Sequence, residues 1–343
     1  MFRVKLCLVF IKNFFLILLN PMITKKILLS GVKPTGRPHI GNYFGAMKQF
    51  VSMQNDFESY IFIADLHALT TIQNKRELEE NTLGVLLDYL AIGLDPKNIT
   101  LYKQSDVPQV TELTWIFNCI TTMPYLMRSH VFKDAEAKDK EISVGTFNYP
   151  MLMASDILLY DADVVPVGQD QKQHIEYTRD TAQKFNHIFS KEVFKLPDAK
   201  ILDTVAVVPG TDGQKMSKSY GNTIPLFASD EEIEKAVMSI VTNSSAVGEG
   251  GRPENVYAIH RLIKSEEELA PIYAENMGKY KNLKEALIKD LNEFIKPLRE
   301  KREQLASNPD YVLDILKEGG KRAKAIAEKK MEQVRDVVGV RLY

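Results

Sequence analysis

Hydrophobic and polar positions follow two different periods along most of the chain. Short apolar runs with the length of buried strands occupy residues 27–29, 60–64, 99–102, 162–167 and 204–208. The stretches between them repeat apolar residues with the period of an amphipathic helix, as from about Gly41 to Met53. Strands that alternate with helices favour a mostly parallel sheet covered by helices. The pattern therefore predicts an α/β fold in which ligands bind at the carboxyl ends of the strands.

A long helical stretch separates the third of these strands from the fourth. It runs from about Gln104 to Tyr149 and contains Trp115, the only tryptophan, and a charged segment at 133–141. We expect it to be an insertion, about 104–149, between the two halves of the sheet domain.

The last third of the chain carries helical signals only. Two capping-box motifs, S-x-x-E, begin at Ser229 and Ser265. A stripe at helical spacing follows, made of Leu283, Leu287, Leu291, Phe294 and Leu298. Pro297 falls inside this stripe, and we expect it to kink or break the helix. The chain is thus predicted to form an α/β domain at 22–222 and an all-helical domain at 223–343.

The first 21 residues differ from the rest. Leu6 to Leu19 is apolar except for Lys12 and Asn13, and two basic residues precede it, as in a signal peptide. However, Lys12 interrupts the apolar run, which is too short to span a membrane, and no small-residue cleavage site follows. We expect Met22 to be the true start and 1–21 to be an upstream extension. A signal or membrane anchor is the alternative.

Composition narrows the class of protein. Of 343 residues, 45% are hydrophobic and 26% are charged, which argues against disorder and against a multi-span membrane protein. The formal net charge of -1 means that any nucleic-acid surface must be a local patch, for which the end of the chain offers Lys317, Lys321, Arg322, Lys324, Lys329 and Lys330. Two cysteines, Cys7 and Cys119, are too few for a disulfide framework or a cysteine-based zinc site, so we expect a cytoplasmic protein without a structural metal.

Two loops have the chemistry of phosphate binding. Ser30 to Asn42 follows the first strand, is rich in glycine and leads into a helix N-terminus, which together favour an anion. Gln214 to Ser219 carries Lys215 and Lys218 in a glycine-rich segment that we expect to be mobile. Taken alone, the first loop is an ordinary strand-to-helix connection and the second a solvated basic turn. Both motifs on one chain, in this order, are far more specific.

Two further positions suggest a nucleotide and an apolar substrate. Gly168 follows the strand at 162–167, and Asp170 beside it can accept bonds from ribose hydroxyls or cap the next helix. Asp156 lies among apolar residues and shares a helix face with Tyr149, Met153 and Tyr160. One carboxylate in an apolar pocket suffices to select an indole by its single N–H, although an internal hydrogen bond could satisfy it instead.

The motifs His39-Ile40-Gly41-Asn42 and Lys215-Met216-Ser217-Lys218-Ser219 resemble the HIGH and KMSKS signatures of class I aminoacyl-tRNA synthetases. The segments between them are similar to those of bacterial-type tryptophanyl-tRNA synthetases, and the resemblance extends from Met22 to the C-terminus. It implies a Rossmann-type catalytic domain with an inserted connective segment, a helical anticodon-binding domain and a homodimer. It also implies ATP and Mg²⁺, formation of tryptophanyl-adenylate and pyrophosphate from L-tryptophan, and transfer of tryptophan to tRNA(Trp).

The resemblance assigns roles to individual positions. The catalytic residues would be His39, Asn42, Lys215 and Lys218. The ATP site would comprise Lys33, Pro34, Thr35, Gly41, Asn42, Gly168, Gln169, Asp170, Lys215, Met216, Ser217, Lys218 and Ser219. The tryptophan site would comprise Asp156, Tyr149, Met153, Gln171, His67, Val165, Val167 and Leu29. Two positions depart from the family pattern: Lys33 stands where many members have glutamine, and Asn42 replaces the last histidine of the first signature, a familiar exchange in this subfamily.

Three other functions compete with this interpretation. A tyrosyl-tRNA synthetase shares the fold and both signatures, but often uses a tyrosine on the first strand, where this chain has Leu29. A non-catalytic paralogue that binds tRNA or senses an amino acid would keep the motifs. A nucleotidyltransferase that does not act on tRNA would have little use for residues 223–343.

Overall fold

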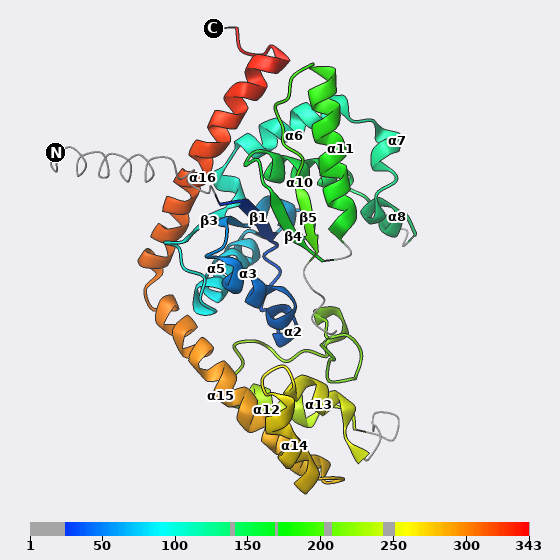
Figure 1. Ribbon diagram of the computed structural model, residues 1–343, viewed down its shortest axis with the longest axis vertical. Coiled ribbons are helices and arrows are strands. Elements are labelled where there is room, and N and C mark those ends of the chain that lie inside the picture. The colour runs from blue at the N-terminus through cyan, green and yellow to red at the C-terminus, as the bar shows by residue number, and fades with distance from the viewer. Residues whose placement is uncertain (1–24, 138–140, 169–170, 202–207, 243–250, 343) are drawn as a thin grey trace, which may run out of the picture.

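The computed structural model describes residues 25–137, 141–168, 171–201, 208–242 and 251–342. The expectations for the first 21 residues therefore lie outside the described residues. Figure 1 shows an elongated molecule, with the sheet and its helices at one end and a cluster of short helices at the other. Two long C-terminal helices run along one side and join the two ends.

The sheet contains five parallel strands in the order β3-β2-β1-β4-β5. Their bounds are β1 Ile27–Val32, β2 Glu58–Ile63, β3 Ile99–Lys103, β4 Val164–Val167 and β5 Asp198–Ile201. The first four confirm the strands predicted from the sequence. The fifth strand, β5, was not predicted, and the predicted strand at 204–208 lies outside the described residues except for Val208, which is not in a strand. β5 has two charged residues among its four, so the sequence gives it no apolar run to recognise.

Apolar side chains fill both faces of the sheet. Leu28 and Ile61 belong to one buried cluster, whereas Leu29, Tyr60 and Phe62 belong to another, because successive side chains of a strand point to opposite faces. The five residues from Ser59 to Ile63 are consecutively buried, as expected for a parallel strand covered by helices on both sides.

The helices of the first two thirds follow the expected pattern. The predicted helix at 41–53 is formed by α2 Ile40–Asn42, a π-helical turn at Tyr43–Met47 and α3 Lys48–Met53. The predicted insertion is helical among its described residues. The helices from β2 onward are α4 Asp65–Ala68, α5 Lys75–Ala91, η2 Gln104–Asp106, α6 Gln109–Ile120, α7 Met123–Leu126, α8 His130–Ala137, α9 Val144–Phe147, α10 Tyr149–Leu158 and α11 Lys172–Ile188.

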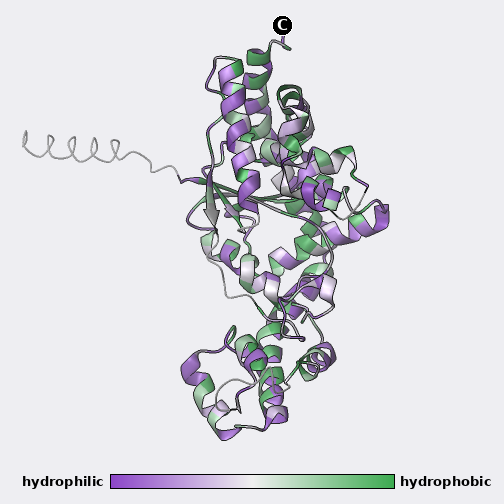
Figure 2. Ribbon diagram, turned by 90° about the vertical axis from the view of Figure 1, so that its right-hand side faces the viewer, coloured by the Kyte–Doolittle hydropathy of each residue, from purple (hydrophilic) through white to green (hydrophobic). Residues whose placement is uncertain are grey.

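After Thr223 the described residues form helices and no strand. These helices are α12 Asp230–Met238, α13 Glu254–His260, α14 Glu266–Glu275, α15 Tyr280–Ala306 and α16 Pro309–Val338. Both predicted capping boxes are present: Ser229 and Ser265 each exchange hydrogen bonds with the glutamate three residues later. Figure 2 shows that many helices carry hydrophilic residues on one side and hydrophobic residues on the other.

Of the kink or break predicted at Pro297, the break is wrong, because α15 continues through this residue to Ala306, and the kink stays a prediction. A proline inside a helix removes one backbone hydrogen bond and crowds the preceding turn. Leu287, Leu291 and Ile295 are buried against the core just before the proline, and Arg299 and Arg302 hold the next turns to Asp230 and Asp88. These contacts stabilise the helix on both sides of Pro297.

The last helix returns to the sheet instead of staying with the other C-terminal helices. A Cβ atom on Gly319 of α16 would lie 1.8 Å from the Leu101 carbonyl oxygen, so the helix backbone rests directly on β3. Arg322 donates to the Ile99 carbonyl oxygen at 3.1 Å. The helix therefore packs against the strand that ends just before Gln104.

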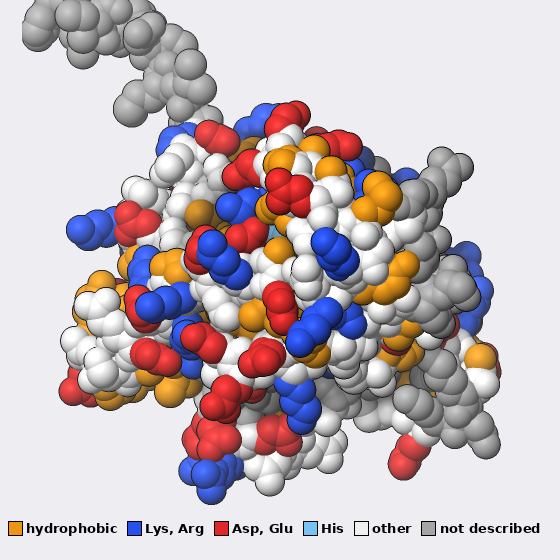
Figure 3. All heavy atoms as spheres, turned by 90° about the horizontal axis from the view of Figure 1, so that it is seen from below, with side chains coloured by type: hydrophobic (Ala, Val, Ile, Leu, Met, Phe, Trp, Pro, Cys, Tyr) orange, Lys and Arg blue, Asp and Glu red, His pale blue; other side chains and the backbone are white. Residues whose placement is uncertain are grey.

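Among the described residues, none of the helices combines the length and apolar character that crossing a membrane requires. The face in Figure 3 carries acidic and basic side chains interspersed with each other, without a single-sign field.

Candidate active site

The order of the strands places the candidate residues at one edge of the sheet. The chain leaves β1 toward β2 on one side and, later, reaches β4 on the other, so the crevice of this doubly wound sheet opens between the carboxyl ends of β1 and β4. Lys33, Pro34 and Thr35 follow β1, and Gly168 follows β4. Gln169 and Asp170, predicted for the ATP site, lie outside the described residues.

The first signature is held by a strand-like contact with a distant segment. His39 begins α2, and its backbone N–H donates to Asn42 Oδ1 at 3.0 Å. Ile40 N–H donates to the Ile224 carbonyl oxygen at 3.0 Å, and Leu226 N–H to the Pro38 carbonyl oxygen at 3.0 Å. The segment after the second signature thus pairs with the first signature.

Glycine is required at position 41 for close packing. A Cβ atom there would lie 2.8 Å from His39 Nδ1 and 3.4 Å from the Cβ of Met216. Met216 belongs to the second signature and is itself buried. The two signatures therefore contact each other at Gly41, as their common assignment to one site predicts.

His39 is buried and uncharged. Burial and the nearby Lys218 ammonium lower the pKa of His39 to about 4. Its Nδ1 atom is buried and has no hydrogen-bond partner among the described residues. Both facts suit a residue that binds a polar ligand through a neutral imidazole.

The second signature is organised by Asn222, a residue that the sequence analysis did not single out. Asn222 is buried; its Oδ1 accepts from Ser217 N–H at 2.8 Å, and its Nδ2 donates to Asp212 Oδ1 at 2.7 Å and to the Lys215 carbonyl oxygen at 3.2 Å. A Cβ atom on Gly210 would collide with this side chain at 2.2 Å. One asparagine thus fixes the shape of the whole loop.

The two signature lysines have different surroundings. Lys218 Nζ donates to the carbonyl oxygens of Thr35 and Gly36, at 2.9 and 3.0 Å, which links it to the first loop. The Lys215 side chain is exposed, and its ammonium group makes no hydrogen bond or ion pair within the part of the chain that the structure describes. Lys33, the departure from the family pattern, donates from Nζ to Thr70 Oγ1 at 3.1 Å, and burial lowers its pKa. All three lie on the first or second signature loop.

The remaining candidates of the ATP site are accessible. Asn42, Thr35 and Gly168 are exposed, whereas Pro34 is buried beneath them. The Ser217 and Ser219 hydroxyls lie 2.9 Å apart at the surface of the second loop.

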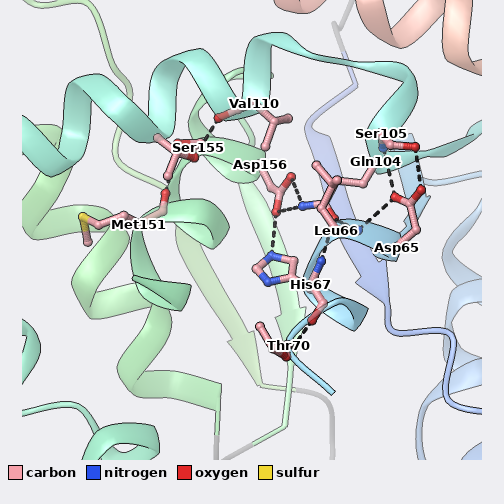
Figure 4. A network of polar contacts seen from close by, with 11 residues as sticks. Asp65, Leu66, His67, Thr70, Gln104, Ser105, Val110, Met151, Ser155 and Asp156 are labelled. Carbon is pink, nitrogen blue, oxygen red and sulfur yellow. Dashed lines mark hydrogen bonds and ion pairs between the residues drawn. The ribbon is translucent and has the colours of Figure 1, made fainter. Parts of the chain in front are cut away.

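Asp156 lies at the centre of a buried polar network (Figure 4). His67 Nε2 lies 2.9 Å from Asp156 Oδ2, and Gln104 Nε2 donates to both carboxylate oxygens at 2.9 Å. Burial raises the pKa of Asp156, and the bonds from His67 and Gln104 oppose that rise. Internal hydrogen bonds thus engage Asp156, which is the alternative left open by the sequence. A carboxylate has about four acceptor positions, so this engagement leaves capacity for one further donor.

The apolar candidates line the same side of the sheet. Leu29, Val165 and Val167 are buried in one cluster, and Met153 packs against it. The Tyr149 ring lies 4.3 Å from the His67 ring, centre to centre, and burial raises its pKa to about 12. Gln171 caps α11, and its N–H donates to the Gly168 carbonyl oxygen at 3.0 Å. Of the predicted tryptophan-site residues, His67 thus bonds to Asp156, Tyr149 packs on His67, and the apolar members share one buried cluster.

Gln104 and Asp65 complete the network but were not predicted from the sequence. Gln104 is fully buried, and Asp65 accepts bonds from the backbone and hydroxyl of Ser105 at 3.0 and 2.5 Å. Gln104 directly follows β3, and Asp65 lies two residues after β2. A polar residue at the end of a strand was the available signal, because side chains at the carboxyl ends of parallel strands meet in the ligand crevice.

The cationic surface predicted near the C-terminus is partly engaged in the fold. Arg322 binds backbone carbonyl oxygens near β3, Lys321 pairs with Glu318, and Lys330 pairs with Asp161. Lys317, Lys324 and Lys329 are exposed and form no ion pair among the described residues.

Comparison with known proteins agrees with this geometry. The family model described as tRNA synthetases class I (W and Y) matches residues 24–302. The chain therefore belongs to the class I tRNA synthetases that act with tryptophan or tyrosine.

Relatives define the branch within that class. The tryptophan–tRNA ligase of Fusobacterium nucleatum is 50% identical to this chain, over 91% of this chain and 97% of its own length. The tryptophan–tRNA ligase of Rhodopirellula baltica is 48% identical, over 92% of this chain and 99% of its own length. The crystal structure of Campylobacter jejuni tryptophanyl-tRNA synthetase with ADP and tryptophan is 41% identical, with a TM-score of 0.86 over 91% of this chain and 99% of that one. The chain belongs with the bacterial tryptophan–tRNA ligases, enzymes that use ATP to join tryptophan to tRNA.

Proposed function

We propose that the residues gathered at the β1–β4 crevice carry out adenylate formation. In this step a carboxylate oxygen of L-tryptophan attacks the α-phosphorus of ATP, the bond to the bridging oxygen breaks, and pyrophosphate leaves. A terminal ribose hydroxyl of tRNA(Trp) then attacks the carbonyl carbon of this mixed anhydride, the bond from that carbon to the phosphate oxygen breaks, and AMP leaves. The contact of Met216 with Gly41 is the observation that carries this proposal, because it brings both signatures to one site. No covalent enzyme intermediate is needed, since positioning and electrostatic stabilisation suffice for such chemistry.

The phosphate side of the site is assigned to exposed donors. His39 and Asn42 at the start of α2 would bind the phosphates, and a neutral His39 can donate without adding charge. Lys215 would meet the charge that develops on the leaving pyrophosphate, since its ammonium group has no partner in the described fold. Lys218 would add its charge after leaving the Thr35 and Gly36 carbonyl oxygens.

The residues present fit ATP at this position. The buried Nδ1 of His39 lacks a partner among the described residues and can bind a polar ligand atom. The described residues contain no cluster of three His, Cys, Asp or Glu side chains that could hold a metal ion. We assign Mg²⁺ to the ATP phosphates, whose charge it would offset. The nucleoside would lie along Gly168, Gln169 and Asp170, with Lys33, Pro34 and Thr35 opposite.

The amino-acid side is assigned to the network around Asp156. Asp156 would accept the indole N–H, a donor that has no competing acceptor on the same ring. Leu29, Val165, Val167, Met153 and His67 would enclose the ring, and Tyr149 and Gln171 would meet the substrate ammonium group. Leu29 offers no hydroxyl to a phenol, which favours tryptophan over tyrosine as the substrate.

We propose a homodimer because large apolar side chains stand in solvent on the insertion. Trp115 is 70% exposed, Met123 66% and Val144 74%. Exposed apolar groups of this size mark interaction surfaces when they are contiguous. Light scattering would report a dimer, and Trp115→Glu would lower the apparent mass; a wild-type monomer would contradict the proposal.

The helical domain at 223–343 is proposed to bind the anticodon arm, and the free cations Lys317, Lys324 and Lys329 to contact phosphates. A cytoplasmic location follows from a tRNA substrate. The boundaries at 22–222 and 104–149 remain predictions of the sequence pattern.

The deciding experiment is amino-acid-dependent exchange of labelled pyrophosphate into ATP, with protein that starts at Met22 and each of the twenty amino acids in turn. Exchange with tryptophan alone is expected. Exchange with tyrosine would overturn the pocket assignment but leave the fold. No exchange would favour a non-catalytic paralogue, and repeating the assay with residues 1–21 restored would test their contribution.

A further inference from the structure

Gln104 is a completely buried glutamine whose two polar side-chain atoms, Nε2 and Oε1, are both directed at the site (Figure 4). Its Nε2 donates to Asp156 Oδ1 and Oδ2, both at 2.9 Å. Its Oε1 accepts from the backbone N–H groups of Leu66 and His67, at 3.1 and 3.3 Å. One side chain therefore connects the start of α4 to the carboxylate on α10.

These bonds leave the Asp156 carboxylate little freedom. A donor shared between two carboxylate oxygens fixes the plane of the group, and His67 Nε2 at 2.9 Å from Oδ2 fixes it from a second direction. Of the two oxygens, Oδ1 has one protein partner and Oδ2 has two. Oδ1 is therefore the oxygen with more capacity for a ligand donor.

The backbone that carries Gln104 is held in place as well. It follows β3, whose backbone touches α16 at Gly319, and the adjacent Ser105 is bound through its backbone and hydroxyl to Asp65. Asp65 is the first residue of α4, the helix that also carries His67. Gln104, His67 and Asp156 are thus held from three secondary-structure elements at once.

We propose that Gln104 is a positioning residue for indole selection: it orients the Asp156 carboxylate so that Oδ1 accepts the substrate N–H, and it sets the distance between Asp156 and His67. The inference rests on the proposed role of Asp156. It gives Gln104 no contact with the substrate, so its removal changes selectivity through the carboxylate.

The test compares two substrates in pyrophosphate exchange: L-tryptophan and L-3-benzothienylalanine, in which sulfur replaces the ring N–H. Gln104→Leu removes both functions of the side chain. Gln104→Glu keeps the shape and the acceptor oxygen for α4 but removes the amide donor. A hydrogen bond to a charged group contributes about 1.5–3 kcal/mol, which corresponds to about a 10- to 150-fold change. We expect kcat/KM for tryptophan to fall by at least about 10-fold in both variants, mostly through KM, and that for benzothienylalanine by less than about threefold.

Gln109→Leu is the matched control, because Gln109 is a buried glutamine nearby that bonds to Glu328 and has no contact with Asp156. This variant should keep the wild-type ratio of kcat/KM for tryptophan to kcat/KM for benzothienylalanine. The KM for ATP and the melting temperature of each variant report whether the site is folded.

A collapse of the tryptophan-to-benzothienylalanine ratio in both Gln104 variants, with KM for ATP unchanged, supports the proposal. Equal loss for both substrates, or no loss for either, overturns it and leaves Gln104 with a purely structural role. Asp156→Asn separates the proposed role of Asp156 from the inference about Gln104. If this variant keeps the wild-type ratio of kcat/KM for the two substrates, Asp156 does not recognise the indole, whatever the Gln104 variants do.

Discussion

The proposed amino-acid side and the proposed phosphate side of this site are built in opposite ways. Asp156, His67 and Gln104 are buried and bound to one another, whereas Lys215, Lys218 and Asn42 are exposed and belong to the two signature loops. A buried carboxylate needs fixed donors, because burial without them costs several kcal/mol. Lysines that stabilise a transient charge instead need long, flexible side chains on loops that can move. If the proposed roles hold, substrate selection is carried out by buried residues of the fold, and charge stabilisation by the exposed loops.

Among the variants that test this difference, we expect the largest effect from Lys215→Ala, which should lower kcat for adenylate formation. The substitution removes a cation aimed at the leaving pyrophosphate, and the loss of one such group typically lowers kcat by about 10²–10³-fold. Tryptophan affinity should stay within about twofold, because Lys215 has no link to Asp156. Single-turnover adenylate formation and equilibrium tryptophan binding measure the two quantities. Lys191→Ala, an exposed lysine beyond α11, is the control; wild-type kcat in Lys215→Ala would remove this lysine from the mechanism.

The second prediction concerns the pH dependence of stability near the first signature. The pKa of His39 falls from 6.5 to about 4 on folding, so the unfolded chain binds a proton that the folded chain does not between these values. The stability from a neutral His39 is complete above pH 6.5 and is lost as the pH falls toward 4. The loss down to pH 4 should amount to about 3 kcal/mol, since the two pKa values differ by about 2.5 and one pKa unit corresponds to about 1.4 kcal/mol.

Urea unfolding of the wild type and of His39→Asn, at several pH values between 4 and 7.5, measures this difference. The difference in free energy of unfolding between the two proteins should increase with rising pH. A constant gap would mean that His39 titrates in the folded chain as it does in the unfolded chain.

The third prediction tests the contact between the two signatures. Gly41→Ala introduces a Cβ atom 2.8 Å from His39 Nδ1, which forces the ring or Met216 to move. Overpacking of this kind costs about 1–3 kcal/mol, so kcat/KM for ATP should fall about 5- to 100-fold while tryptophan binding persists. Gly45→Ala is the matched control on the same helical segment, because its Cβ atom meets nothing within 4 Å. Equal behaviour of the two variants would contradict close packing at Gly41.

The smallest effect is expected from Arg37→Ala. Arg37 lies in the first loop and pairs with Glu232 of α12 at 3.0 Å, but both side chains are about half exposed. Exposed pairs contribute about 0.2–1 kcal/mol, so the free energy of unfolding should fall by no more than that. Thermal melts at low and high salt measure it, with Arg76→Ala, from an exposed pair within α5, for comparison. A loss above 2 kcal/mol would show that this pair holds the loop to the helical region.

Most of the fold could be predicted from the sequence because its signals are local. The apolar runs of β1 to β4 and the capping boxes at Ser229 and Ser265 each depend on a few adjacent residues, and all are confirmed. β5 could not be predicted, since Asp198–Ile201 becomes a strand by pairing with β4 and carries no apolar run of its own. The break at Pro297 was wrongly predicted because packing partners distant in sequence hold α15 together.

The site residues also divide into those that could be predicted from the sequence and those that could not. Both signatures and Asp156 could be predicted because their residue types are unusual for their surroundings. Gln104 and Asn222 could not, because their roles depend on bonds to residues 52 and 5–10 positions away, which the fold alone brings together. The roles of the predicted residues in binding ATP and tryptophan remain predictions.

The packing of α16 on β3 also bears on how the chain is made. β3 is the outer strand of the described sheet, and an outer strand with free backbone groups invites pairing with other chains. Gly319 and Arg322 cover its carbonyl oxygens, but they lie near the C-terminus. During synthesis the sheet is finished long before its cover emerges from the ribosome. A nascent chain that stops before α16 is therefore expected to aggregate through β3, and early termination would be more harmful than the loss of a peripheral helix suggests.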